Sequence, residues 1–409
     1  MNTHAPYRHD SSPAGHLVVL GSGPQAEWEH AMQRLAAGGP LLLIDDEPPN
    51  WQHPHLAGAR TANLLNPQHV LKEARKFAFT RPIDGVLNFH PAHARAAAHL
   101  RQELRLPGPS AATLEASTLR HCTAELLAGA GVDHSGAIHA DSFDQALEAA
   151  HQVGFPLVCK PASPRKRYAG RRVSGLPELA EAFSAATAAT WPGTGTVVEP
   201  LLDGIEATAY TVSSASSSQI VAVSHTTFDP RAELSMLPVE VVVDADDVCA
   251  PAIEDIAHRA LSALGHHSGP AQIRLRITAT GPRVISITPH LTDPLMGMLI
   301  EQVTGIDLIS AAARHARGQR TARVTEESRL GATAVRFIQG PNTTGLLPHN
   351  AAAHPHITPY ATLQPYATVR RVGALRRYGH LVVSGADYPQ CVARLRSAAS
   401  ELRTAHLSA

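Results

Sequence analysis

The sequence of 409 residues has few cysteines, no long apolar run and no net charge. Its four cysteines lie far apart without CxxC spacing, which argues against a zinc centre or a disulfide scaffold. No apolar run approaches the ~18 residues that a membrane-spanning helix needs. The 35 basic and 35 acidic side chains cancel, so no overall charge attracts nucleic acid or an anionic membrane. These absences favour small molecules or proteins as partners. A cytoplasmic location is expected, because residues 1–15 also lack the apolar core of a signal peptide.

A chain of this length, with 44% hydrophobic residues, predicts two or three domains. Residues 1–15 are polar, and we expect a disordered tail there. From residue 16 onward, apolar strands such as HLVVL and PLLLID alternate with helical patterns, one of them from about Pro67 to Phe79. A strand-and-turn pattern, LRLPGPS, follows at 104–110. This alternation predicts a parallel, Rossmann-like α/β domain.

The first strand ends in a glycine turn that approximates a dinucleotide-binding motif. Gly21, Gly23 and Ala26 have roughly the required spacing, and the acidic pair 45–46 follows about twenty residues later. Pro24, however, stands where the helix should donate backbone N–H groups to a pyrophosphate, and proline has none. A nicotinamide- or flavin-dependent oxidoreductase is therefore an alternative that rests on these glycines alone. The other interpretation is a tight turn between strand and helix.

Two segments about forty residues apart are the most informative. In FPLVCKPA, Lys160 ends an apolar strand, and in VVEPLLDGIEATAYTV, Glu199 and Glu206 stand seven positions apart. Together they resemble the nucleotide cleft of the ATP-grasp superfamily. The resemblance implies that Lys160 contacts a phosphate and that Glu199, with the hinge after it at Leu201 and Leu202, holds adenine. It also implies that Glu206 accepts from the ribose. The alternatives are a surface lysine and two exposed acids at a turn.

The resemblance extends to further phosphate-binding residues. Arg120, near the start of a predicted helix, matches a lysine of the family that contacts the nucleotide phosphates. The loop ASPRKRYAGRRVSG matches the family's phosphate loop and carries five cations, of which Arg171 belongs to a GRG-like end. Side-chain cations would here replace a backbone cradle. A solvated basic loop is the alternative.

The family's metal ligands are replaced in this chain. The segment GPAQIRLRITATGPRVISITPHLTDPL matches the two strands that hold magnesium in the family. Arg274 stands at the first glutamate and Ser286 at the second, Thr288 at the asparagine, and His290 at the arginine. Magnesium prefers hard oxygen ligands, and a guanidinium repels it. The resemblance thus implies ATP as cofactor, puts Arg274 and His290 at catalytic positions, and predicts that the magnesium ligands are lost.

The implied fold is α/β and has three parts after the tail. These are a Rossmann-like pre-ATP-grasp domain (16–112), an ATP-grasp α+β core (113–330) and a small, lid-like C-terminal α+β subdomain (331–409). The chain is most similar to the carboxylate–amine ligase and carboxylase-like branches. An active ligase would phosphorylate a carboxylate with ATP, and an amine would displace the phosphate to give an amide and ADP. The alternative is a catalytically degenerate protein that binds nucleotide or a partner without turnover, for example as a subunit beside an active paralogue. The resemblance to related branches also implies a homodimer.

Overall fold

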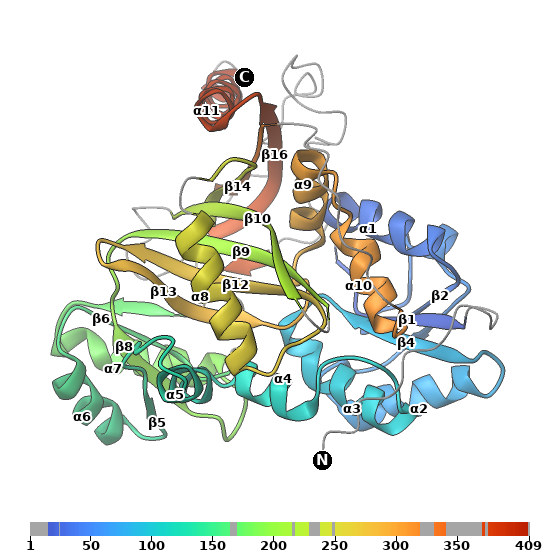
Figure 1. The fold of residues 1–409 in the computed structure, drawn as a ribbon, viewed down its shortest axis with the longest axis horizontal. Coiled ribbons are helices and arrows are strands. Elements are labelled where there is room, and N and C mark those ends of the chain that lie inside the picture. The colour runs from blue at the N-terminus through green and yellow to red at the C-terminus, as the bar shows by residue number, and fades with distance from the viewer. Residues whose placement is uncertain are drawn as a thin grey trace.

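The computed structural model describes residues 15–23, 25–163, 170–214, 217–228, 238–247, 250–319, 331–340, 370–372 and 375–407. These residues form three sheets with helices packed against them (Figure 1). The predicted α/β class is confirmed. Most of the predicted tail and the basic residues 165–167 lie outside the described residues.

The N-terminal sheet is parallel and has the strand order β3-β2-β1-β4. Its strands are β1 (His16–Leu20), β2 (Leu41–Asp45), β3 (Gly58–Thr61) and β4 (Ile83–Asn88). Along β1, Leu17 and Val19 enter one core cluster while Val18 and Leu20 enter another, because successive side chains point to opposite faces. A strand that is apolar at every position needs cover on both faces. The covering helices are α1 (Gln25–Ala37), α2 (Pro67–Ala78) and α3 (Ala94–Leu104).

The strand predicted within 104–110 does not form. Helix α3 ends at Leu104, and Arg105 follows in the left-handed conformation with φ 53° and ψ 45°. Pro107 and Pro109 have no N–H to donate to a strand ladder, so this segment stays irregular. It leads into α4 (Ala111–Thr118) and α5 (Arg120–Gly129).

The second sheet is antiparallel, with the strand order β5-β8-β6-β7. Its strands are β5 (Ile138–Ala140), β6 (Leu157–Pro161), β7 (Arg171–Val173) and β8 (Thr196–Pro200). Helices α6 (Phe143–Val153) and α7 (Leu176–Ala189) cover one face, where their buried alanines pack against Leu157 and Cys159. Strand alternation places Val158 and Lys160 on the other face.

The third sheet has eight antiparallel strands in the order β13-β12-β9-β10-β11-β14-β16-β15. They are β9 (Ile205–Ser214), β10 (Ser217–Phe228), β11 (Pro238–Asp244), β12 (Gly269–Thr278), β13 (Gly281–Thr288), β14 (Ala332–Gly340), β15 (Arg370–Val372) and β16 (Leu375–Gly385). The segment predicted as the C-terminal subdomain supplies β14, β15 and β16 to the sheet that also contains strands of the predicted core.

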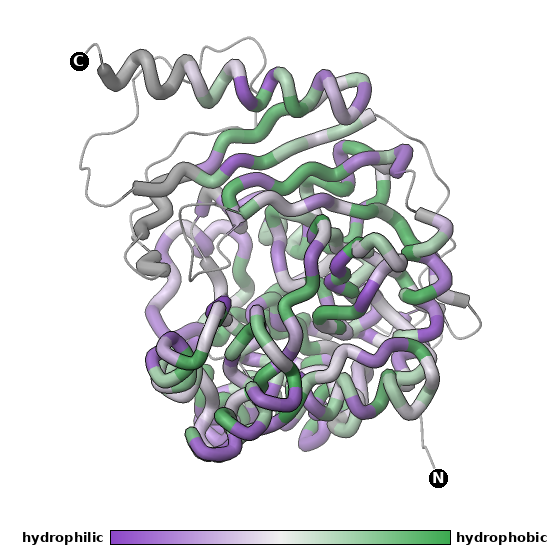
Figure 2. Tube along the Cα trace, turned by 90° about the vertical axis from the view of Figure 1, so that its left-hand side faces the viewer, coloured by the Kyte–Doolittle hydropathy of each residue, from purple (hydrophilic) through white to green (hydrophobic). Residues whose placement is uncertain are grey.

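Helices connect this sheet to the rest of the molecule. Helix α8 (Ala250–Ala263) packs on β9, β12 and β13, and α11 (Tyr388–Leu407) packs on β14 and β16. Helices α9 (Pro294–Thr304) and α10 (Leu308–Ala316) pack against α1, and one hydrophobic cluster runs from β1 through these helices to the large sheet. Hydrophobic residues accordingly gather in the interior strands (Figure 2).

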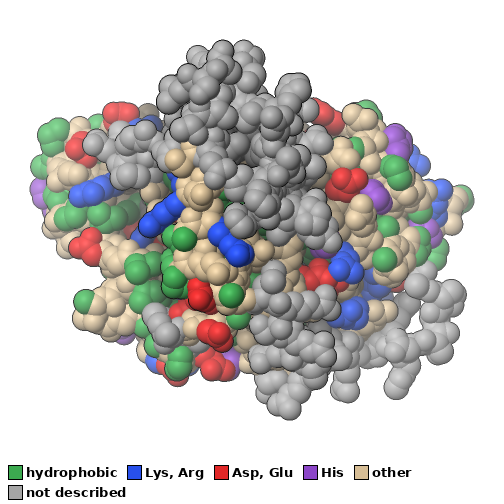
Figure 3. Space-filling model, turned by 90° about the horizontal axis from the view of Figure 1, so that it is seen from above, with side chains coloured by type: hydrophobic (Ala, Val, Ile, Leu, Met, Phe, Trp, Pro, Cys, Tyr) green, Lys and Arg blue, Asp and Glu red, His purple; other side chains and the backbone are tan. Residues whose placement is uncertain are grey.

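The visible surface carries both acidic and basic side chains, as expected for a chain with no net charge. On the face seen in Figure 3, the acidic and basic side chains of the described residues are interspersed among other types.

No single helix among the described residues is long and apolar enough to cross a membrane. Helices α9 and α10 pass that test only as a pair bent by 119°, and their apolar residues lie in the core.

Candidate active site

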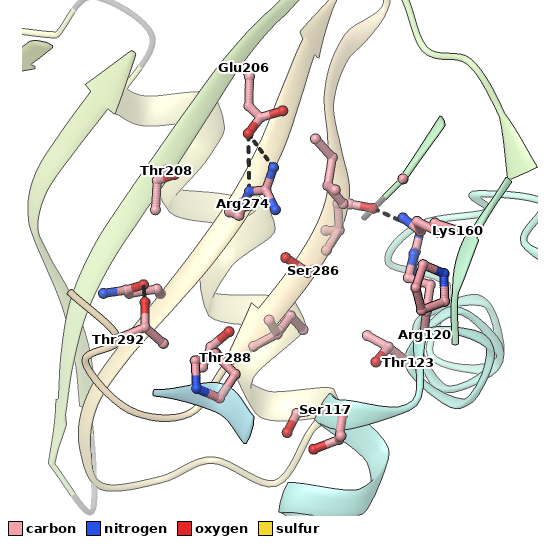
Figure 4. Close-up of a pocket in the computed structure, with 18 of the residues that line it drawn as sticks. Ser117, Arg120, Thr123, Lys160, Glu206, Thr208, Arg274, Ser286, Thr288 and Thr292 are labelled. Carbon is pink, nitrogen blue, oxygen red and sulfur yellow. Dashed lines mark hydrogen bonds and ion pairs between the residues drawn. The ribbon is translucent and has the colours of Figure 1, made fainter. Parts of the chain in front are cut away.

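A cavity of about 300 Å³ lies between the small sheet and the large sheet. Strands β6 and β8 provide one wall, strands β9, β12 and β13 provide the floor, and residues of α3, α4 and α5 complete it. Figure 4 shows Lys160 and Arg120 on one side of the pocket and Arg274 and Glu206 on the other. Ten of the residues named from the sequence line this cavity: Arg120, Lys160, Glu199, Leu201, Leu202, Glu206, Arg274, Ser286, Thr288 and His290. Long-range folding therefore brings together segments that are far apart in the chain.

Glu199 holds two cations on one side of the cavity. Its Oε2 accepts from Arg120 Nε at 2.9 Å, and its Oε1 accepts from Lys160 Nζ. Strand pairing explains the contact, because Glu199 lies opposite Val158, two residues before Lys160 on the same face. Arg120 is buried at the first turn of α5, where the helix dipole disfavours a cation, and Glu199 offsets that cost.

The pKa values of this cluster follow from burial and charge. Burial lowers the pKa of Lys160 to about 8, with the charge of Glu199 acting in the opposite direction and that of Arg120 adding to the decrease. Burial alone would raise the pKa of Glu199, but the neighbouring charges of Lys160 and Arg120 outweigh it and the pKa is lowered. Glu199 is therefore ionised at neutral pH, and Lys160 loses its proton around pH 8.

Glu206 holds two further cations on the floor of the cavity. Arg274 Nε donates to its Oε1 at 3.1 Å, and Arg276 Nη2 donates to its Oε2 at 3.2 Å (Figure 4 shows the contacts with Arg274). The register of β12 with β9 places Arg276 directly opposite Glu206 and Arg274 opposite Thr208. Glu206 is 3% exposed, and both of its oxygens accept from arginine. The carboxylate expected to receive ribose hydroxyls is thus already engaged.

The positions matched to metal ligands lie together but carry the wrong donors for magnesium. Arg274 pairs directly with Ser286 across β12 and β13, and Thr288 pairs with Gln272. Among the described lining residues, the carboxylates are Glu199, Glu206 and Asp293. The first two are ion-paired, and Asp293 caps α9 by accepting from the Leu295 N–H at 3.1 Å. No group of three His, Cys, Asp or Glu side chains suited to a metal occurs in the described part of the chain. These donors do not fit a magnesium ion.

The hinge between β8 and β9 brings the two clusters to the same cavity. The Leu201 N–H donates to Pro156 O at 3.2 Å, while Leu201 and Leu202 line the cavity. Gly204 follows with φ 129°, and a Cβ there would lie 2.0 Å from the carbonyl oxygen of Ile277. The Gly204 oxygen accepts from Arg276 Nη1 at 3.1 Å. Only glycine fits this close passage of two backbones.

Arg171 does not take its predicted place. Its Nη1 donates to Glu181 Oε1 on α7 at 2.6 Å, and the residue does not line the cavity. Its neighbour Gly170 does, next to Lys160. The end of the loop thus reaches the cavity at Gly170, whereas the Arg171 side chain is directed towards α7.

Several lining residues were not found from the sequence. The Arg95 guanidinium lies 6.0 Å from the centre of the Trp191 ring, and the two residues reach the cavity from α3 and from the turn before β8. Arg95 forms no hydrogen bond or ion pair with any other described residue. The available signal was its position just after the carboxyl end of β4, where parallel α/β sheets build their sites. His290 lies 3.3 Å from the amide nitrogen of Asn88, also at the end of β4.

The glycine turn after β1 is hydrogen-bonded to Asp45, the acidic residue that follows it in the motif. Asp45 Oδ2 accepts from the Ser22 N–H at 2.9 Å, and Gln52 Nε2 donates to Ser22 Oγ at 2.8 Å. Burial raises the pKa of Asp45. Gly21 has φ 75°, and a Cβ there would lie 2.6 Å from the ring of His93. Packing against His93 therefore explains this glycine without a dinucleotide.

Comparisons with known proteins identify the fold. No family model matches the sequence. A curated relative, the uncharacterised protein y4rH of Sinorhizobium fredii, is 24% identical over 311 residues, which are 75% of this chain. The chain spans 64% of the length of that relative.

Solved structures match almost the whole chain. An L-amino acid ligase from Bacillus licheniformis has a TM-score of 0.76 at 18% identity, covering 96% of this chain and 98% of its own. N5-carboxyaminoimidazole synthetase from Staphylococcus aureus in complex with ADP has a TM-score of 0.76 at 14% identity, covering 97% and 100%. A biotin carboxylase complex with β,γ-ATP from Campylobacter jejuni has a TM-score of 0.70 at 15% identity, covering 94% and 90%. The chain therefore has the ATP-grasp fold.

Proposed function

We propose that this protein binds an adenine nucleotide in the cavity between the small and large sheets. The observation that carries the proposal is the buried Glu199 cluster, in which Lys160 and Arg120 meet one carboxylate beside the hinge at Leu201 and Leu202. The apolar hinge suits a purine ring, and the cations suit phosphates. The Leu202 N–H forms no hydrogen bond with another described residue and can serve the edge of the base.

The roles of the lining residues follow from this arrangement. Lys160 and Arg120 would contact the phosphates at one wall, and Arg274 would contact them from the floor. Because Arg274 and Ser286 replace carboxylates, the metal-assisted charge neutralisation used in phosphoryl transfer lacks its protein ligands among the described residues. We therefore favour binding without turnover, by a homodimer or by a subunit that accompanies an active paralogue.

Calorimetry with ATP and ADP tests this proposal. We expect both to bind to the wild type, and the variant Lys160→Met to bind about tenfold more weakly or worse, since a charge-assisted hydrogen bond contributes about 1.5–3 kcal/mol. Lys72→Met, on the exposed side of α2, is the matched control and should leave affinity unchanged. A folded wild-type protein that binds neither nucleotide would rule the proposal out.

A second function is ATP-dependent ligation of a carboxylate to an amine. Its support is the match to an L-amino acid ligase over 96% of this chain. In that reaction the γ-phosphoryl group passes to a carboxylate oxygen, and the amine nitrogen then attacks the acyl carbon, loses a proton and releases phosphate. ADP release that requires both a carboxylate and an amine from a panel of amino acids would favour this function over binding alone.

A further inference from the structure

Each of the two buried carboxylates of the cavity holds two cations. Glu199 accepts from Arg120 and Lys160, and Glu206 accepts from Arg274 and Arg276. One negative charge against two positive charges leaves a surplus of one positive charge at each cluster while Lys160 is protonated. The cavity thus presents two positive centres, one on the wall and one on the floor. The carboxylate at each centre already forms ion pairs with both of its cations.

Arg274 is the member of the floor cluster that reaches the open space. Its side chain is 35% exposed, whereas that of Arg276 is 11% exposed and that of Glu206 is 3% exposed. The strand register sets it between Ser286 and Thr208, and Figure 4 shows the hydroxyl groups of Ser286 and Thr288 on the same floor. A guanidinium flanked by hydroxyl groups is a phosphate-binding surface.

Unsatisfied polar atoms around the cavity point the same way. Arg120 Nη1, Arg276 Nε and Gln272 Nε2 are buried without a hydrogen-bond partner among the described residues. All three can only donate, and a buried donor without a partner is costly. The three residues line the cavity, so these groups add donors rather than acceptors to its surroundings. A magnesium ion needs acceptors, which these groups cannot supply.

We infer that magnesium opposes nucleotide binding at this cavity, the reverse of the requirement implied by the ATP-grasp resemblance. The inference rests on the proposed nucleotide-binding function. Arg274 takes the phosphate charge directly. Chelation by magnesium removes the negative charge that the two clusters complement, and it places a hydrated cation among guanidinium groups.

Calorimetry with ADP, in EDTA and in excess magnesium at matched ionic strength, tests the inference on the wild-type protein. We expect affinity to fall about tenfold in magnesium, a change of about 1.4 kcal/mol. Inorganic pyrophosphate, titrated in the same two buffers, should show the same decrease because the effect belongs to the phosphates. Affinity that is unchanged or higher in magnesium would overturn the inference while leaving nucleotide binding intact. Absence of binding in both buffers would instead reject the proposed function.

Variants assign the effect to Arg274. In Arg274→Gln, the difference between the two affinities should shrink from about tenfold to about threefold, since the floor then carries no surplus charge while the wall keeps its own. Arg75→Gln removes an exposed arginine of α2 that pairs with Glu103, and it should keep the wild-type difference. A full magnesium effect in folded Arg274→Gln would contradict the role of Arg274. If that variant does not fold, the two wild-type titrations decide the inference.

Discussion

At the scale of single residues, the site is defined by two carboxylates that each pair with two cations. Lys160 and Arg120 share the carboxylate of Glu199, and burial lowers the pKa of Lys160 to about 8. A lysine whose pKa is lowered by burial in a cleft is typical of functional sites. Its charge in the free protein therefore depends on pH over a range that is easy to measure.

The pH dependence of nucleotide affinity should report Lys160. Phosphates favour the charged lysine, so above pH 8 the free protein must first take up a proton, and affinity should fall by up to about tenfold per pH unit from about pH 8 to about pH 9.5. Lys160→Arg keeps its charge in this range, and its affinity should stay nearly constant. Calorimetry over the range measures both slopes, and equal slopes would show that Lys160 is not the titrating group.

At the scale of elements, the short connection between β8 and β9 positions the site. It carries the hinge residues Leu201 and Leu202, and its Gly204 passes against the backbone of Ile277 on β12. This contact sets the distance between the Glu199 cluster on one sheet and the Glu206 cluster on the other. A change in the connection should therefore affect both stability and binding.

Gly204→Ala should be strongly destabilising. Its φ is 129°, and an added Cβ would lie 2.0 Å from the Ile277 oxygen, so we expect the free energy of unfolding to fall by about 3 kcal/mol. Gly193→Ala is the control, because its φ is 75° and nothing lies within 4 Å of the added Cβ. Gly193→Ala should lower the free energy of unfolding by only about 1 kcal/mol. Urea unfolding compares the two, and equal losses would mean that the connection between β8 and β9 can move aside.

The elements also show which parts of the site can be predicted from the sequence and which cannot. Lys160 and the hinge could be located because an apolar strand ending in lysine and a spaced pair of glutamates are local patterns. The pairing of Glu206 with Arg274 and Arg276 depends on the register between β9 and β12, which are about sixty residues apart in the chain. No local pattern encodes that register. The direction of Arg171 was missed because an acid on α7, Glu181, competes for it.

At the scale of the whole molecule, three parts of the chain meet at one cavity. Helix α3 of the N-terminal part supplies Arg95, the small sheet supplies Lys160 and Glu199, and the large sheet supplies the floor. Arg95 and Trp191 contact each other across two of these parts. Trp191 is consequently a natural reporter of ligands in the cavity, since Trp28 and Trp51 do not line it.

Tryptophan fluorescence should change when ADP binds. We expect the change to disappear in Trp191→Phe, while calorimetry finds an affinity within about fivefold of the wild type because a cation–π contact is worth about 0.5–1 kcal/mol at an exposed site. Trp51→Phe is the control and should keep the change. A signal that persists in Trp191→Phe would mean that nucleotide binds elsewhere or that distant tryptophans respond.

The most direct test of the central claim is a crystal structure determined after soaking with ADP and magnesium. The account predicts density for the base at Leu201 and Leu202, phosphates in contact with Lys160, Arg120 and Arg274, and no cation between Arg274 and Ser286. A magnesium ion bound between those two residues, or a nucleotide outside this cavity, would contradict it.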